Sequence, residues 1–131
     1  MNAFRQVEYF NKAVIGIERE CPQTLGIDKR WLIGAILEEL EELLEADNTV
    51  DEADALADII YFAMGGFTRM GISSKKASRI FNAVHCANMA KVAGKKESRA
   101  VEGVTDAAKP VTWVGPEETI KQIIDGDDYD Y

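Results

Sequence analysis

The segment between Arg30 and Arg69 contains no Lys and no Arg, and this absence constrains the fold more than any other feature of the sequence. Ten acidic residues lie in it, so the segment carries a charge of −10, whereas the whole chain sums to −8 and the remainder to +2. A block of like charge is usually a solvated tail, but this one is rich in Leu, Ile, Ala and Phe. A folded segment of this kind is expected to bind cations. Its acids are Glu38, Glu39, Glu41, Glu42, Glu45, Asp47, Asp51, Glu52, Asp54 and Asp58.

Helical periodicity predicts that the segment folds into two helices joined by a short turn. On each helix, apolar residues recur at a spacing of about 3.6 and form one stripe that we expect to face the core. The second helix is expected to begin at Thr49, where Thr49-x-x-Glu52 matches a capping box. The turn at 47–49 is short enough to make the helices antiparallel, which lets their acidic faces meet. The predicted core stripes are Ile33, Ile36, Leu37, Leu40, Leu43 and Leu44 on the first helix, and Ala53, Leu56, Ile60, Ala63 and Phe67 on the second.

The carboxylates of these helices are either an exposed charged face or the ligands of a metal ion. Asp58 stands within Ala-Leu-Ala-Asp-Ile-Ile-Tyr-Phe, where a buried charge needs a partner or a metal. Like charges four residues apart destabilise a helix, and a divalent cation held between them would reverse that effect. We therefore assign Glu39, Glu42 and Asp58 to a site for Mg²⁺ or Mn²⁺, because both ions suit carboxylate oxygens. Glu41 and Glu45 are better explained as a solvated face.

Composition and charge exclude several classes of function. No apolar run approaches the roughly 18 residues needed to cross a bilayer, and the first residues form no signal peptide, so we expect a cytoplasmic protein without a membrane partner. Cys21 and Cys86 lack the spacing of a zinc site and are too few for a disulfide framework, in keeping with a reducing compartment. The net charge of −8 argues against a nucleic-acid polymer as partner, because such polymers require a basic surface.

The rest of the chain predicts an all-α fold, a bundle of four main helices in a single domain that covers residues 1–131. Helical spacing of apolar residues, together with Pro and Gly at the breaks, defines the remaining elements. They are a first helix at about 3–18, a fourth helix capped by Ser73 or Ser74, a polar loop at about 94–114, a short C-terminal helix begun by Pro116, and an acidic tail at about 125–131.

Three short motifs resemble those of the MazG-like all-α nucleoside triphosphate pyrophosphohydrolases, which include dimeric dUTPases and phosphoribosyl-ATP pyrophosphohydrolases. Glu38-Glu39-Leu40-Glu41-Glu42 matches the EExxE part of the family's metal motif, and Asp58 matches the final Asp of its ExxD part. Ala55 stands where ExxD has a Glu, and the resemblance suggests Asp54, one turn before Asp58, as the substitute ligand. Ala87-Asn88-Met89-Ala90-Lys91 is similar to the family's SNMxK segment, which helps hold substrate phosphates.

The resemblance implies a Mg²⁺-dependent hydrolase, with Mn²⁺ as the alternative ion, that converts a nucleoside triphosphate to the monophosphate and pyrophosphate. Glu38 would orient or deprotonate the attacking water. Relatives assemble as oligomers, so we expect a homodimer or a homotetramer. The implied metal ligands are Glu39, Glu42, Asp54 and Asp58. The substrate-binding candidates are Asn88, Lys91 and Lys95, which share one side of the fourth helix and its extension, and Lys109, whose Lys-Pro pair is similar to one in relatives.

Two other functions stay open at this point. Phosphoribosyl-ATP pyrophosphohydrolase activity would share the chemistry and differ in the base and ribose pocket. A non-catalytic helical oligomerisation module would leave the acids as plain surface and make assembly the whole function. In either case, large side chains outside the two apolar stripes are the expected oligomer interface. They are Trp31, Tyr61, Phe62 and Met64.

Overall fold

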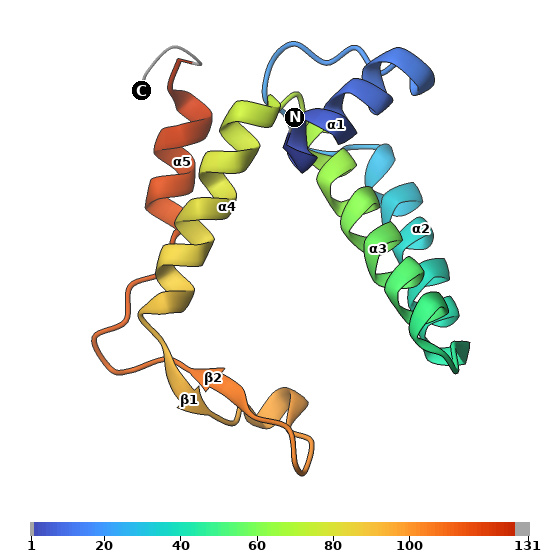
Figure 1. Ribbon diagram of the computed structural model, residues 1–131. Coiled ribbons are helices and arrows are strands. Elements are labelled where there is room, and N and C mark those ends of the chain that lie inside the picture. The colour runs from blue at the N-terminus through green and yellow to red at the C-terminus, as the bar shows by residue number, and fades with distance from the viewer. Residues whose placement is uncertain (1, 128–131) are drawn as a thin grey trace. The chain divides into compact units, whose positions relative to one another are not determined.

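The computed structural model describes residues 2–127 and divides the chain into two compact units, 1–77 and 78–131. Figure 1 shows a helical chain with one small two-stranded hairpin, so the all-α prediction is confirmed and the hairpin is an unpredicted addition. The described α-helices are α1 (Ala3–Phe10), α2 (Asp28–Glu45), α3 (Thr49–Arg69), α4 (Ser74–Met89) and α5 (Glu117–Asp125), with a π-helix at Asn11–Ile15 and a 3-10 helix at Glu97–Arg99. The strands are β1 (Val92–Gly94) and β2 (Asp106–Ala108), which pair antiparallel.

Each unit has buried apolar side chains of its own, and the boundary between the units falls inside α4. Because the chain divides into two units, the single domain stays a prediction. The cytoplasmic location also stays a prediction. Within residues 2–127, none of the helices combines the length and the apolarity needed to cross a bilayer. The predicted acidic tail lies largely outside the described residues, although Asp125 is the last residue of α5. The buried apolar residues are Val7, Leu32, Ala55, Ile72 and Ala77 in the first unit, and Ile80 and Ile123 in the second.

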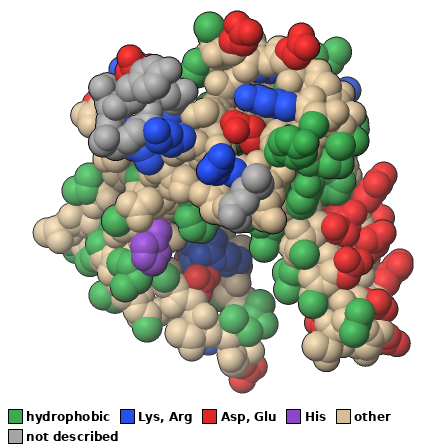
Figure 2. Space-filling view, turned by 45° about the horizontal axis from the view of Figure 1, so that its top comes forward, with side chains coloured by type: hydrophobic (Ala, Val, Ile, Leu, Met, Phe, Trp, Pro, Cys, Tyr) green, Lys and Arg blue, Asp and Glu red, His purple; other side chains and the backbone are tan. Residues whose placement is uncertain are grey.

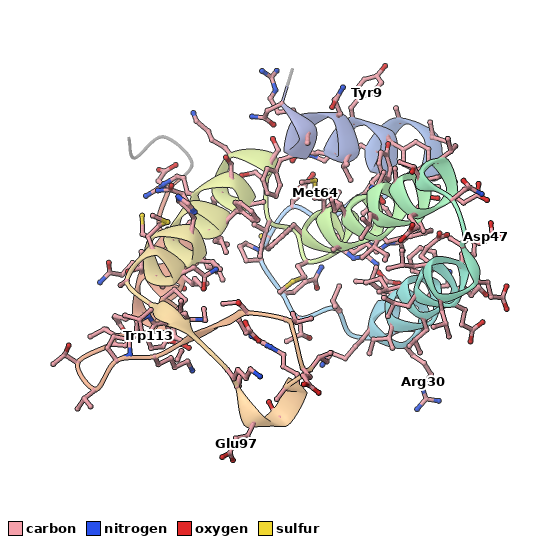
Figure 3. The ribbon with its side chains drawn as sticks, turned by 60° about the horizontal axis from the view of Figure 1, so that its bottom comes forward. Tyr9, Arg30, Asp47, Met64, Glu97 and Trp113 are labelled. Atoms are coloured by element: carbon pink, nitrogen blue, oxygen red, sulfur yellow. The ribbon has the colours of Figure 1, made fainter. Side chains whose placement is uncertain are left out.

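The hairpin of α2 and α3 is the main packing of the first unit, and the two helices run side by side (Figure 1). Asp47 lies in the short turn between them (Figure 3). Asn48 caps α3, because its Oδ1 accepts a hydrogen bond from the backbone N–H of Asp51 at 2.9 Å. The capping box predicted at Thr49 is therefore wrong, since an Asn one residue earlier takes the cap position and Thr49 is already helical.

The predicted core stripes of α2 and α3 are largely exposed in the single chain. Leu37, Leu56 and Ile60 are 53%, 51% and 53% exposed, respectively. The buried side chain of α2 is instead Leu32, which packs against Gly66 so closely that a Cβ there would lie 2.8 Å from it. The prediction that the stripes form a core within one chain is therefore wrong, because periodicity identifies an apolar face but not what covers it. The exposed members are Ile33, Leu37, Leu40, Leu44, Leu56 and Ile60.

The first helix is shorter than predicted. Helix α1 ends at Phe10, a π-helix follows at Asn11–Ile15, and Gly16 ends it in the left-handed conformation with φ of +83°. The Asn11 Nδ2 donates a hydrogen bond to the Val7 carbonyl at 2.9 Å. Such a side-chain bond competes with the regular helical pattern, which accounts for the widened turn at this position.

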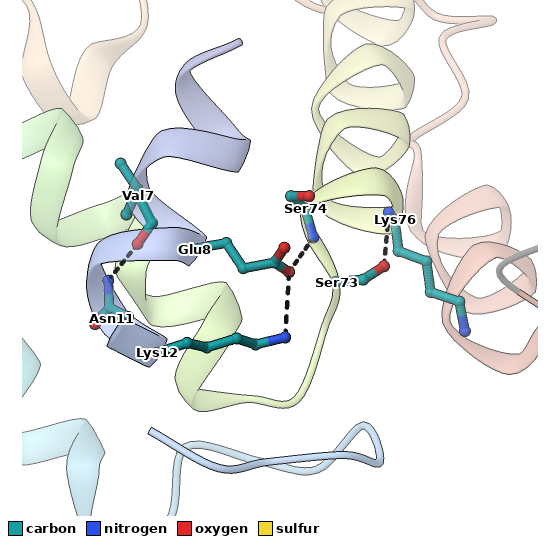
Figure 4. Close-up of polar contacts among 7 residues, drawn as sticks. All are labelled: Val7, Glu8, Asn11, Lys12, Ser73, Ser74 and Lys76. Atoms are coloured by element: carbon teal, nitrogen blue, oxygen red, sulfur yellow. Dashed lines mark hydrogen bonds and ion pairs between the residues drawn. The ribbon is translucent and has the colours of Figure 1, made fainter. Parts of the chain in front are cut away.

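Polar contacts tie α1 to the beginning of α4 (Figure 4). The backbone N–H of Ser74 donates to Glu8 Oε2 at 2.7 Å, and the Lys12 Nζ lies 3.9 Å from the same oxygen. Ser73 caps α4 as predicted, since its Oγ accepts a hydrogen bond from the Lys76 N–H at 3.2 Å. The carboxylate of Glu8 thus lies at a helix N-terminus, where the helix dipole favours a negative charge.

The exposed apolar face of the hairpin leads us to expect that a second copy of the chain covers it. Light scattering at micromolar concentration should then give a particle at least twice the 14.5 kDa of one chain. Ile33→Glu should weaken this assembly, because it places a charge on the face that would be buried. Val111→Glu is the matched control, since Val111 is fully exposed in a loop. A 14.5 kDa particle for the unmodified chain would contradict the expectation.

Candidate functional site

Three carboxylates of the α2–α3 hairpin meet in one place, which we call the acidic cluster. One oxygen each from Glu39, Glu42 and Asp58 lies within 4.8 Å of the other two. Glu39 and Glu42 are three residues apart on α2, so they are neighbours on its surface, and Asp58 approaches from α3. Figure 2 shows acidic side chains gathered along this hairpin, at the right of the view. The hairpin therefore brings together three of the four predicted metal ligands.

The surroundings of Glu39 in the acidic cluster raise its pKa. A hydrogen bond with Glu42, burial, and the negative charges of Glu42, Asp58 and Asp54 raise the pKa of Glu39 from 4.5 to about 7. The Glu39 Oε2 is enclosed from solvent and has no hydrogen-bond partner among the described residues. Ion pairs at Glu8 and Asp28 lie elsewhere in the first unit, and none of residues 2–127 forms an ion pair with Glu39, Glu42 or Asp58. The cluster thus holds more negative charge than its described neighbours compensate.

The donor set of the acidic cluster fits a hard divalent cation. Mg²⁺ and Mn²⁺ take carboxylate oxygens as ligands. An enclosed oxygen without a partner, such as Glu39 Oε2, is the kind of group that a metal ion satisfies. Two more carboxylates within 4.8 Å supply oxygens on the same side. The residues present therefore fit the metal that the motif implies.

The remaining predicted acids lie outside the three-residue cluster. Asp54 is exposed, but its negative charge contributes to the raised pKa of Glu39, so it is close enough to act on the cluster. Glu38 is also exposed. Ala55, which replaces the Glu of the family motif, is only 2% exposed and packs inside the hairpin. Position 55 is a packing position in this chain, and the acid beside it is Asp54.

An apolar pocket of about 230 Å³ borders Asp58 and so adjoins the acidic cluster. Two edge-to-face ring pairs line it, Phe10 with Tyr61 at 5.4 Å and Trp31 with Phe62 at 6.1 Å between centroids. Trp31, Tyr61 and Phe62 thus contact other rings within the chain, but Trp31 and Tyr61 are still 50% and 39% exposed, so their role in an oligomer interface stays a prediction. The volume lies below the range of about 300–1,000 Å³ usual for whole ligands, so the pocket suits one ring system.

Asn11 is a buried polar residue of this pocket, whose lining also includes Asp58 and Arg69, and sequence reasoning missed it. It is 6% exposed and belongs to the π-helix, whose wider turn is a feature that often marks functional sites. Gly65 of α3 makes room for its amide, because a Cβ there would lie 2.9 Å from Asn11 Nδ2. The lone Asn in the apolar pattern of the first helix was the available signal.

The four predicted substrate-binding residues line one pocket of about 630 Å³ in the second unit. The structure thus groups Asn88, Lys91, Lys95 and Lys109, although they span the hairpin and its loops. Sequence reasoning missed Trp113, which also lines this pocket. A tryptophan in an otherwise polar loop could have marked this residue as a candidate. Its contacts with the pocket cannot be predicted from its position in the sequence.

The family model for phosphoribosyl-ATP pyrophosphohydrolase matches residues 19–88, more than half of the chain. The match contains the complete acidic cluster and ends at Asn88. Lys91, Lys95, Lys109 and Trp113 lie beyond it. No curated protein matches the chain.

The raised pKa of Glu39 predicts how the metal-free protein responds to pH. Because the folded pKa of about 7 exceeds the ordinary 4.5, the folded chain holds a proton that the unfolded chain releases, and stability falls as pH rises from about 4.5 through 7. Glu39→Gln removes the titrating carboxyl group, and its amide N–H can still donate a hydrogen bond to the Glu42 carboxylate. We expect its melting temperature in EDTA to exceed that of the unmodified protein at about pH 8.

The control for this prediction is Glu41→Gln, which removes an exposed carboxylate from the same helix but outside the cluster. Its melting temperature should follow that of the unmodified protein across the pH range. Equal stability of Glu39→Gln and the unmodified protein at about pH 8 would show that the cluster carries no uncompensated charge.

Proposed function

This chain belongs to the phosphoribosyl-ATP pyrophosphohydrolase family, and we propose that it is a Mg²⁺-dependent enzyme that cleaves a nucleoside triphosphate to the monophosphate and pyrophosphate. Its family makes it a hydrolase of acid anhydrides, acting on phosphoribosyl-ATP or related nucleotides, within the all-α MazG-like superfamily. Membership of this enzyme family therefore argues against the alternative of a non-catalytic oligomerisation module.

The acidic cluster is the observation that supports the Mg²⁺ dependence. Glu39, Glu42 and Asp58 are the residues that would hold the ion, with exposed Asp54 as a further ligand. A bound divalent ion supplies Lewis-acid polarisation of phosphate oxygens and lowers the pKa of water. The enclosed Glu39 Oε2, which lacks a partner in the described chain, favours this assignment over a plain solvated face.

Glu38 is the proposed acceptor of the proton from the attacking water. Its exposed carboxylate adjoins Glu39 in sequence and is not one of the three that the cluster brings together. The water oxygen forms a bond to phosphorus while the anhydride bond between the α and β phosphates breaks. Pyrophosphate leaves with the electron pair of that bond, and the water proton passes to Glu38.

Two pockets, one in each unit, are candidates for substrate binding. Lys91, Lys95 and Lys109 are proposed to offset phosphate charge through charge-assisted hydrogen bonds, and Asn88 to donate from its amide. The aromatic pocket is the proposed place for the nucleobase, because it shares Asp58 with the acidic cluster. Aromatic side chains pack well against a flat heterocycle, either edge to face or offset-stacked, so the rings of this pocket suit a base.

Phosphoribosyl-ATP is the second candidate substrate, and the family match favours it. Both substrates require cleavage of the same bond and differ in what the base pocket must accept. Release of pyrophosphate should be measured with phosphoribosyl-ATP and with canonical and damaged nucleoside triphosphates at equal Mg²⁺. The substrate with the highest kcat/KM decides between the candidates, and the absence of pyrophosphate from every one would contradict the proposal.

Removal of one ligand charge should abolish turnover without unfolding the protein. We expect Glu42→Gln and Asp58→Asn each to lower kcat/KM by more than about 100-fold, because even groups that only support a metal ligand contribute 10- to 100-fold. Each change is nearly isosteric and removes repulsion, so the helical circular dichroism should persist. Glu41→Gln, outside the cluster, is the control and should keep its activity. Full activity in either cluster variant would remove the metal assignment.

A further inference from the structure

Arg69, the last residue of α3, lines the aromatic pocket together with Asp58 of the acidic cluster. The two residues are separated by about three helical turns, so they lie on the same face of α3 and about 16 Å apart along its axis. One of them stands at each end of the stretch of α3 that lines the pocket. A carboxylate of the proposed metal site therefore borders the pocket from one end of this stretch, and a guanidinium group borders it from the other.

The guanidinium group of Arg69 is largely buried, yet it makes few polar contacts. The side chain is 12% exposed, and its Cζ lies 4.1 Å from the centroid of the Trp31 ring. The Nη1 lies 3.7 Å from Asp28 Oδ2, which is too long for a hydrogen bond. Among residues 2–127, no group accepts a hydrogen bond from the Arg69 side chain. A guanidinium group carries five N–H donors, so donors remain for a ligand in the pocket.

The charge of Arg69 is only partly balanced, because Asp28 is shared with a second arginine. Arg19 Nη2 donates to Asp28 Oδ2 at 3.5 Å, and Arg69 approaches the same oxygen. One carboxylate balances only one of two guanidinium groups, so positive charge is left beside the pocket. Arg19 does not line the pocket, and the donors within reach of a ligand are those of Arg69. This end of the pocket therefore favours a ligand edge that carries hydrogen-bond acceptors.

We propose that Arg69 determines which nucleobase the aromatic pocket accepts, and that it selects 6-oxopurines such as guanine and hypoxanthine. These bases carry two adjacent acceptors, O6 and N7, which a forked guanidinium group can contact together. Adenine has an amino donor in place of O6, and that donor would face the N–H groups of Arg69. Uracil and thymine offer O4 as a single acceptor on the corresponding edge. The inference rests on the proposed function, whose substrates it narrows to oxopurine nucleotides rather than adenine nucleotides.

Calorimetric titration of the full-length chain with inosine monophosphate (IMP) and with AMP, at equal Mg²⁺, tests the proposal without turnover. Neither nucleotide has an anhydride bond to cleave, and the two bases differ only around C6. We expect IMP to bind about tenfold or more tightly than AMP, because the guanidinium group discriminates between their edges. Equal affinity for the two, tighter binding of AMP, or no binding of either would overturn the proposal.

Substitution of Arg69 separates base selection from a purely structural role. If Arg69 only holds Asp28 and Trp31 in place, Arg69→Met should weaken IMP and AMP binding alike and leave their ratio unchanged. Selection by Arg69 predicts instead that the ratio falls to about 1, and that Arg69→Lys, which keeps the charge but loses the fork, also lowers it. Arg19→Lys is the matched control, since Arg19 contacts the same Asp28 outside the pocket, and it should keep the ratio. An unchanged ratio in a folded Arg69→Lys or Arg69→Met variant would contradict the assignment.

Fluorescence locates the binding at the ring beneath Arg69. The chain has two tryptophans, so Trp113→Phe leaves Trp31 as the only indole, and its emission should change when IMP binds beside the guanidinium group. Unchanged Trp31 emission at saturating IMP would place the base elsewhere and overturn the proposal.

Turnover distinguishes failure of this inference from failure of the proposed function. The unmodified enzyme should release pyrophosphate from inosine and guanosine triphosphates with a kcat/KM about tenfold or more above that for ATP. Pyrophosphate release with equal kcat/KM for all three would uphold the function and overturn the selection by Arg69. Selective binding of IMP without pyrophosphate release from any nucleotide would instead count against the proposed function and uphold the base pocket.

Discussion

Repulsion among carboxylates that two helices hold in one place is the interaction on which the functional interpretation depends. The Glu39 Oε2 is shielded from solvent and has no hydrogen-bond partner among residues 2–127. A hydrogen bond with Glu42, burial, and the charges of Glu42, Asp58 and Asp54 raise the pKa of Glu39 to about 7. A globular chain does not gain stability from such an arrangement. The cluster is therefore best explained as a binding site for a cation. The carboxylate repulsion that destabilises the metal-free fold would be relieved when the cation binds.

Contacts within the α2–α3 hairpin fix the position of α3 along α2, and this position brings the acids of the cluster together. Asn48 caps α3 directly after a short turn, which sets where α3 begins relative to α2. Gly66 lets Leu32 pack against the backbone of α3, so the two helices approach closely. With those contacts fixed, the helical repeat alone places the acids of α2 opposite Asp58. The same face of α3 then borders the aromatic pocket, which links a binding cavity to the charged site.

The sequence was sufficient to predict α2, α3 and three acids of the cluster, because apolar periodicity defines the two helices and the short turn between them brings their faces together. Glu39, Glu42 and Asp58 could be selected from ten acids since their spacing and apolar neighbours distinguish them. What covers an apolar stripe depends on tertiary packing, so the core assigned to Leu37 and its neighbours was wrong. Strands of three residues are too short to give a pattern, and the contact of Trp113 with Ala87 spans 26 positions, so the second pocket needed the structure.

Calorimetric titration of Mg²⁺ into the metal-free protein, in two buffers of different ionisation enthalpy, tests the central claim most directly. If the ion binds at Glu39, its raised pKa of about 7 requires that the proton be displaced, so about one proton should be released per ion at about pH 6 and far fewer at about pH 8.5. The observed heat at about pH 6 should then differ between the buffers. Saturable Mg²⁺ binding with the same heat in both buffers at that pH, or no binding at all, would contradict a metal site at the acidic cluster.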